Sequence, residues 1–358
     1  MKFIKYFFKR ILPLLVTVFA LIFPLFNVTA AKEDLLEEKI LGSYKGILTL
    51  WHIENFEGGK NSRESFLQRR ALEFNKLNEG VFIQVINMTE EQMLTNLQNG
   101  APFDLISFSL GIGAIIKSYL KVYDGKVNVA DNFLNGIQTD GNYMGLAYSA
   151  GGYVLMAYEE ILNKAGIKFE DMSNCIFEKS SKVKAEPLSV GFSKYNNPLA
   201  AIQSLTGKKG SFRGNIFETT QSEAYTEFVS KNAVFLMGTQ RDIFKKLNRE
   251  SGGELDNIRT VFVKDYTDLV QYIGISKYSD VFKQTMARKF IEYLTSDAVQ
   301  EKLSDIGLFP VNFKSIYTGE KYLEDFELAV KNCKTINVFT SKEELVSLRQ
   351  SSLKALTN

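Results

Sequence analysis

The strongest constraint on the fold is an alternation of strand and helix patterns that begins at residue 47. Three apolar runs indicate buried strands, at 47–51, 81–86 and 104–108. Each run is followed by a segment with helical spacing. Asn61 or Ser62 caps the first helix, and Thr89 with Gln92 forms a capping box at the second. Strands that alternate with helices through short loops form a parallel sheet with helices on both faces. We therefore expect an α/β fold in which these strands end at one edge of the sheet.

Polar and aromatic side chains follow the ends of these strands. In open α/β sheets, ligands bind in the crevice outside the carboxyl ends of the strands. An indole ring offers an apolar face and an N–H donor, and an arginine offers a planar fork of donors. The candidate ligand-binding residues at this edge are Trp51, His52, Glu57, Arg63, Ser107 and Ser109. A core position for Trp51 and a solvated position for Glu57 are the alternatives.

A second group of candidates lies where the chain is expected to cross between two units. Residues 143–158 contain two strand-like runs that join at 149–152 (Ser-Ala-Gly-Gly) with no helix between them. Such a join suits a crossing between domains, and a simple hairpin is the alternative. The strand at 233–237 ends in polar residues that lead into a helix, which is again a strand end suited to a ligand. These positions add Tyr148, Gln240, Arg241 and Tyr272 to the candidates.

Residues 1–31 are typical of an export segment. Basic residues precede an apolar stretch at 11–28, which ends in small residues. We expect cleavage after Ala30 or Ala31. An uncleaved membrane anchor is the alternative, because the apolar stretch is near the lower limit for spanning a bilayer.

Composition limits the size and the chemistry of the protein. The 327 residues after the export segment (358 − 31) are too many for one ordinary core and suit two domains. The formal charge of +2 falls to −2 without the four basic residues of that segment, so nucleic acid is not an expected partner. His52 is the only histidine and no Cys/His cluster occurs, so we expect no metal site, no cofactor and no catalytic residue. A disulfide between Cys175 and Cys333 and a pair of thiols are both compatible with the sequence.

Five segments carry a resemblance through their order and spacing. They are LTLWH at 48–52, PFDLISFS at 102–109, LAYSAGGYVLMAY at 146–158, KNAVFLMGTQR at 231–241 and FIEYLTSDAVQEKLSDIGLFPV at 290–311. Together they resemble the family 1 extracellular solute-binding proteins of ABC importers, the group that includes maltose-binding proteins.

The resemblance implies a type II periplasmic-binding-protein fold, with two α/β lobes, two or three crossing strands and a ligand cleft between the lobes. One lobe would take residues 45–148 and 271–309, and the other 149–270 and 310–358. Both cysteines would then lie in the second lobe. Gram-positive members of this family are usually lipoproteins, and this sequence has no cysteine after its apolar stretch to carry a lipid. The protein would therefore be periplasmic, released, or held at the outer face of the cytoplasmic membrane by its apolar segment.

The function that the resemblance implies is capture of a solute, which we interpret as a carbohydrate, by lobe closure. A monomer outside the cytoplasm would deliver it to the permease subunits of an ABC transporter. Two other functions stay open. A ligand-sensing subunit would have the same fold and a membrane receptor kinase as its partner. A surface glycoside hydrolase would use Glu54 or Glu57, with two carboxyl groups about 5–10 Å apart across a substrate.

Overall fold

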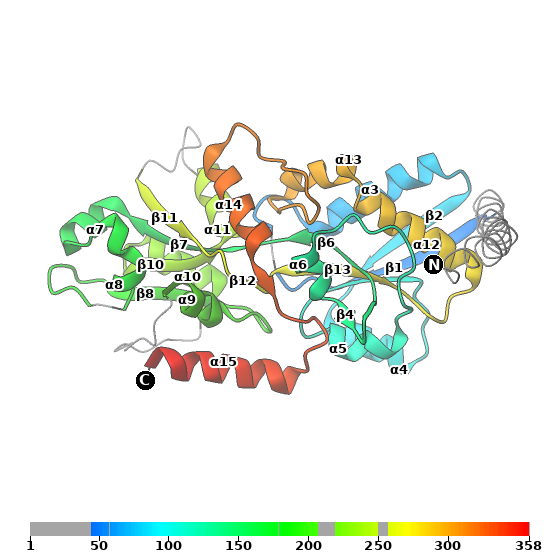
Figure 1. Cartoon of the computed structure of the whole chain (residues 1–358), viewed down its shortest axis with the longest axis horizontal. Coiled ribbons are helices and arrows are strands. Elements are labelled where there is room, and N and C mark those ends of the chain that lie inside the picture. Colours follow the sequence, from blue (N-terminus) through cyan, green and yellow to red (C-terminus); the bar gives the residue numbers. More distant parts are fainter. Residues whose placement is uncertain (1–43, 57, 178, 207–218, 250–256, 358) are drawn as a thin grey trace, which may run out of the picture.

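The computed structural model describes residues 44–56, 58–177, 179–206, 219–249 and 257–357, which form two α/β lobes side by side (Figure 1). The export segment predicted for residues 1–31 and the candidate Glu57 lie outside these ranges. Within the ranges, no helix is long and apolar enough to cross a membrane. Each lobe is built on a five-stranded sheet.

The first lobe contains the parallel strands that the sequence predicts. In spatial order its sheet is β2 (Val81–Asn87), β1 (Gly46–His52), β3 (Leu105–Phe108), β13 (Val270–Ile275) and β6 (Leu146–Ala150). Strand β1 is parallel to β2 and β3, whereas β13 is antiparallel to β3 and β6. The amide N–H of Met88, just after β2, donates to the carbonyl oxygen of His52 at 3.0 Å, so these strands end at one edge as expected.

Helices cover both faces of this sheet. The main ones are α3 (Arg63–Leu77), α4 (Glu90–Gln98), α5 (Gly113–Ile116), α6 (Asp131–Asn135), α12 (Val281–Leu294) and α13 (Asp297–Gln300). Shorter elements are β4 (Gln138–Thr139), β5 (Asn142–Tyr143) and the 3₁₀ turns Lys117–Tyr119 and Glu301–Ile306. Ser62, not Asn61, caps α3, and the predicted capping box of Thr89 and Gln92 begins α4. Helices α3 and α12 pack together through Phe74 and Phe290, whose ring centres are 5.2 Å apart.

The second lobe is built on the central strands β7 and β10. Its sheet, in spatial order, is β11 (Ile258–Phe262), β7 (Tyr153–Tyr158), β10 (Ala233–Thr239), β8 (Glu186–Phe192) and β9 (Thr219–Thr220). Its helices are α7 (Glu159–Ala165), α8 (Met172–Cys175), α9 (Pro198–Thr206), α10 (Gln221–Val229), α11 (Gln240–Arg249) and the 3₁₀ turn Phe169–Asp171. Every residue of β7 and β10 is buried, which explains their continuous apolar sequences.

The two lobes are joined by crossings of the chain. Strand β6 lies in the first sheet and β7 in the second, so the chain crosses at 151–152 and the hairpin alternative is wrong. The chain returns between β12 (Tyr266–Thr267) and β13, and the N–H of Gly151 donates to the carbonyl of Leu269 at 2.6 Å. A third passage runs beside the first, because Phe309 pairs with Ala150. These crossings confirm the expected two-lobed α/β fold.

The C-terminal part consists of α14 (Lys321–Asn332), β14 (Lys334–Thr335) and α15 (Lys342–Thr357). The ring of Phe326 in α14 lies 4.4 Å from that of Phe262 and 4.9 Å from that of Phe309, so α14 packs beside the crossings. Cys175 and Cys333 do not form a disulfide. The lobe bounds given above stay a prediction, because this part of the chain contacts elements of both sheets.

Candidate functional site

Four buried polar side chains meet near the ends of β1, β3, β6 and β13. Ser107 is at their centre: its Oγ lies 2.9 Å from His52 Nδ1 and 2.9 Å from the Tyr148 hydroxyl, and it accepts from Gln271 Nε2 at 3.0 Å. All four side chains are fully buried. We call them the strand-end cluster. It forms because His52 pairs with Ser107 where the parallel strands end.

Burial keeps this cluster uncharged. The pKa of His52 is lowered to about 3 by burial and by the charge of Arg63, so its imidazole is neutral at physiological pH. Burial raises the pKa of Tyr148 to about 12, so its hydroxyl is protonated. A site with neutral donors and acceptors suits a ligand with neutral hydroxyl groups.

Several buried polar atoms in and beside the cluster have no hydrogen-bond partner among the described residues. They are His52 Nε2, Gln271 Oε1, Ser109 Oγ and Ser149 Oγ. A buried donor or acceptor left without a partner costs about 1–3 kcal/mol. A hydroxyl group both donates and accepts, so a polyhydroxyl ligand reaching these atoms would satisfy either role.

Arg63 supports the loop that follows β1. Its guanidinium is fully buried and lies 4.0 Å from the centre of the Phe56 ring. It donates to the Phe56 carbonyl oxygen, and its Nη2 is 3.3 Å from Glu54 Oε1. These contacts hold the 53–56 loop beside the strand-end cluster.

Gln240 and Arg241 come from the second lobe, at the start of α11. Gln240 Oε1 accepts the N–H of Gly152 at 2.9 Å, so this side chain lies at the crossing. Arg241 pairs with Asp242 at 3.2 Å and donates to Ser222 Oγ at 2.8 Å. The first lobe reaches this region through Gly59, where an added Cβ would lie 2.8 Å from the Arg241 Cα.

The remaining candidates pack elsewhere. Trp51 is 2% exposed and its ring centre is 4.9 Å from that of Phe103, so it belongs to the core of the first lobe. The hydroxyl of Tyr272 lies against Gly136, where an added Cβ would come within 2.0 Å of it. Gln271 is not among the sequence candidates although it joins the cluster. The sequence did contain a signal for Gln271, which is a polar residue near the start of an apolar strand. Because successive residues of a strand face opposite sides of the sheet, Gln271 and its neighbour Tyr272 cannot both face the cluster.

The lobes also contact each other at a second place, through Glu90 at the start of α4. Lys194 Nζ and the Tyr195 hydroxyl, which follow β8 in the second lobe, both donate to Glu90 Oε2 at 2.6 Å. The Tyr195 ring lies against Gly111 after β3, where an added Cβ would be 2.3 Å from its Cγ. The strand ends of the two lobes are therefore held face to face in this structure.

No protein-family model matches the chain, and a search of curated proteins finds no match either. Solved structures do match. The GacH receptor of Streptomyces glaucescens, solved with acarbose, is 16% identical over 88% of this chain and 96% of its own, with a TM-score of 0.58. The sugar-binding protein MalE of Xanthomonas citri is 14% identical over 87% of this chain and 97% of its own, with a TM-score of 0.61. A cyclic alpha-maltosyl-1,6-maltose binding protein of Arthrobacter globiformis is 12% identical over 88% of this chain and 100% of its own, with a TM-score of 0.58.

The chain has the fold of these sugar-binding proteins. This likeness confirms the binding-protein fold that the sequence resemblance implied. Two of the three similar proteins are described as binding proteins and the third as a receptor.

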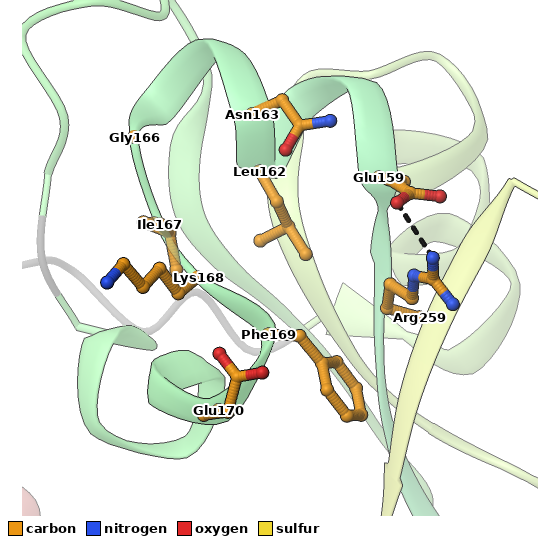
Figure 2. Close-up of a pocket in the computed structure, with 9 residues that line it drawn as sticks. All are labelled: Glu159, Leu162, Asn163, Gly166, Ile167, Lys168, Phe169, Glu170 and Arg259. Atoms are coloured by element: carbon orange, nitrogen blue, oxygen red, sulfur yellow. Dashed lines mark hydrogen bonds and ion pairs between the residues drawn. The ribbon is translucent and has the colours of Figure 1, made fainter.

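Two surface pockets lie away from the strand-end cluster. One, of about 490 Å³, is at the end of the second lobe farthest from the first (Figures 1 and 2). Figure 2 shows Glu159 and Arg259 at its rim, joined by an ion pair of 2.7 Å, and the half-exposed ring of Phe169. The other, also about 490 Å³, is bordered by Phe103, Tyr119 and Tyr278. The residues that line these two pockets include none of the candidates from the sequence.

Proposed function

We propose that this chain is an extracytoplasmic substrate-binding protein that captures a carbohydrate between its lobes and delivers it to the permease of an ABC transporter. The observation that carries the proposal is the set of buried, neutral polar atoms without partners at the strand ends, in a chain with the fold of sugar-binding proteins. Sugar hydroxyls match such atoms in charge and in hydrogen-bonding capacity.

The proposed mechanism is capture by lobe closure, without a chemical step. In an open form, a sugar would reach His52 Nε2, Ser109 Oγ and Gln271 Oε1 on the first lobe. Contacts from the loops after β8 and β10 would then favour the closed form, because a ligand shifts the population toward the state it binds better. The permease would recognise that closed form.

The proposal also covers where the protein is located in the cell, how its two lobes are bounded and that it acts as a monomer. The export segment at residues 1–31 would direct the protein out of the cytoplasm, to the periplasm, the exterior or the outer face of the membrane. The two lobes would take residues 45–148 plus 271–309 and 149–270 plus 310–358. The protein would act as a monomer beside the permease, and we propose no cofactor.

A screen of sugars by thermal unfolding tests the function. A ligand that binds only the folded state stabilises it by about 2.7 kcal/mol at a hundred times its Kd. We expect a neutral mono- or oligosaccharide to raise the Tm of the protein, with calorimetry confirming one site. Stabilisation by amino acids or polyamines, with no response to any sugar, would replace the carbohydrate proposal with another ligand class.

Ser109→Ala gives the screen a sharper test. The Ser109 hydroxyl is buried with no partner among the described residues, so its removal should not lower the stability of the ligand-free protein and should raise it by about 1–3 kcal/mol. Affinity for the sugar found in the screen should fall about two- to tenfold, the effect of one hydrogen bond. Ser189→Ala is the matched control, because Ser189 Oγ donates to the Ala224 carbonyl inside the second lobe at 3.1 Å. That change should reduce stability and leave the affinity unchanged. Unaltered affinity in Ser109→Ala would exclude Ser109 from the site.

A further inference from the structure

The C-terminal residues 333–357, which we call the strap, lie along both lobes (Figure 1). Their first half is bonded to the first lobe and, where β14 pairs with β12, to the segment that leads into the return crossing. The N–H of Val338 donates to the Gly136 carbonyl at 2.7 Å, and Thr335 Oγ1 donates to the Asn132 carbonyl at 2.6 Å. An added Cβ on Gly113 would lie 2.3 Å from the Val338 carbonyl oxygen, so the strap rests directly on α5.

The second half of the strap is bonded to the second lobe. Helix α15 packs on α9. Arg349 donates to the carbonyl oxygens of Ser193 at 2.9 Å and Asn196 at 2.7 Å. Asn197 Nδ2 donates to Ser352 Oγ at 3.2 Å. The loop after β8, which faces the first lobe, is thus fastened to the strap.

The two halves meet at Glu90. This carboxylate, on the first lobe, takes an ion pair from Lys342 of the strap in addition to its bonds from Lys194 and Tyr195. Although burial raises the pKa of Glu90, these three donors lower it to about 2, so the carboxylate stays charged. Leu345 of the strap packs with Tyr195 and with Leu110 of the first lobe in a small apolar cluster.

The lobes cannot separate at this point while all of these contacts persist. Moving the loop after β8 away from α4 breaks the bonds of Lys194 and Tyr195 to Glu90. The strap must also release either its contacts with the first lobe or those with the second. The contacts at Glu90 therefore stabilise the face-to-face arrangement of the two lobes.

We propose that Glu90 and Lys342 are positioning residues for ligand capture, which through the strap set how much of the protein is closed before a ligand arrives. The effect of these residues on the opening of the lobes does not depend on the proposed function; only the resulting effect on ligand affinity rests on it. The apparent affinity of a site formed in the closed form scales with the closed fraction, so residues that do not touch the ligand would tune its Kd.

Hydrogen exchange of the ligand-free full chain tests the proposal, because exchange of protected amides reports the opening equilibrium. In Lys342→Met, peptides covering 109–116 and 193–200 should exchange about two- to fivefold faster, as expected for loss of one partly exposed ion pair. In Glu90→Gln, which loses the ion pairs with both Lys194 and Lys342, the acceleration should be at least as large. The urea midpoint of global unfolding should change little. Lys342→Arg, which keeps the charge, should restore the parental exchange rate.

Lys179→Met is the control. It removes an ion pair of 2.8 Å with Glu186 that lies within the second lobe and is largely exposed. It should leave exchange at both peptides unchanged. Parental exchange in both Glu90→Gln and Lys342→Met, or equal acceleration in Lys179→Met, would overturn the proposal. No sugar is used, so a failure here is distinct from a failure of the carbohydrate screen.

Discussion

His52 is the only histidine of the chain, and its ring is fully buried in the strand-end cluster. Its folded-state pKa of about 3 lies below the ordinary 6.5, because burial and the charge of Arg63 disfavour the imidazolium. Below pH 6.5 the unfolded chain binds a proton that the folded protein does not. Through this residue, stability is therefore full above the ordinary pKa and falls as the pH drops from there toward 3.

We expect the free energy of unfolding to lose up to about 1.4 kcal/mol per pH unit from this linkage as the pH falls below the ordinary histidine pKa. His52→Gln removes the titrating group, so its stability should depend less steeply on pH. Urea unfolding of both proteins between about pH 7 and about pH 5 gives the comparison. Parallel curves for the two proteins would show that His52 is not held neutral by the fold.

At the scale of elements, the junction of β6 and β7 depends on glycine at position 152. An added Cβ would lie 2.4 Å from Val330 Cγ2 and 2.8 Å from Phe326 Cε2, both on α14. Both side chains are fully buried, so neither has room to move. The crossing and α14 are consequently packed too closely to admit a methyl group.

Gly152→Ala should destabilise the protein by about 1–3 kcal/mol, the usual cost of overpacking a core. Adding Val330→Ala to that variant should recover part of the loss, because the smaller side chain makes room for the methyl group. Urea unfolding of the two single variants and the double variant measures this coupling. Additive losses in the double variant would mean that the two residues do not meet.

At the scale of the whole molecule, one continuous apolar core extends through both lobes and the crossings. Trp51 is the only tryptophan and is buried in the first lobe, so its fluorescence reports the unfolding of that lobe alone. Far-UV circular dichroism reports both lobes. Because the core is shared, we expect the two signals to give the same urea midpoint.

Phe228→Ala tests this cooperativity more directly. Phe228 is fully buried in the second lobe and stacks on Tyr158 with ring centres 4.8 Å apart. Its truncation should cost about 3–5 kcal/mol. If the lobes unfold together, the midpoint of Trp51 fluorescence falls although the change is in the other lobe. A fluorescence midpoint that stays in place while the dichroism shifts would show two independent units.

The positions of the candidate residues show how far sequence patterns reach. His52, Ser107 and Tyr148 come together because the strands that carry them end at one edge of the sheet. The ends of these strands can be predicted from the apolar runs in the sequence. Trp51 occupies an equally favourable position in sequence but points into the core against Phe103. Gln271 and Tyr272 are neighbours, yet only the first faces the cluster, because the pairing of β13 decides which face each residue takes.

The sequence by itself determined the α/β class, the parallel direction of the early strands and the capping box at Thr89, and it left the join at 149–152 open between a crossing and a hairpin. These features follow from interactions between residues near in the chain, such as helical spacing and helix caps. Only the tertiary structure decided that Glu90 forms ion pairs with Lys194 and Lys342, and that the strap contacts both lobes. Glu90 and Lys342 are 252 positions apart, and no local pattern encodes a contact that depends on the packing of everything between them.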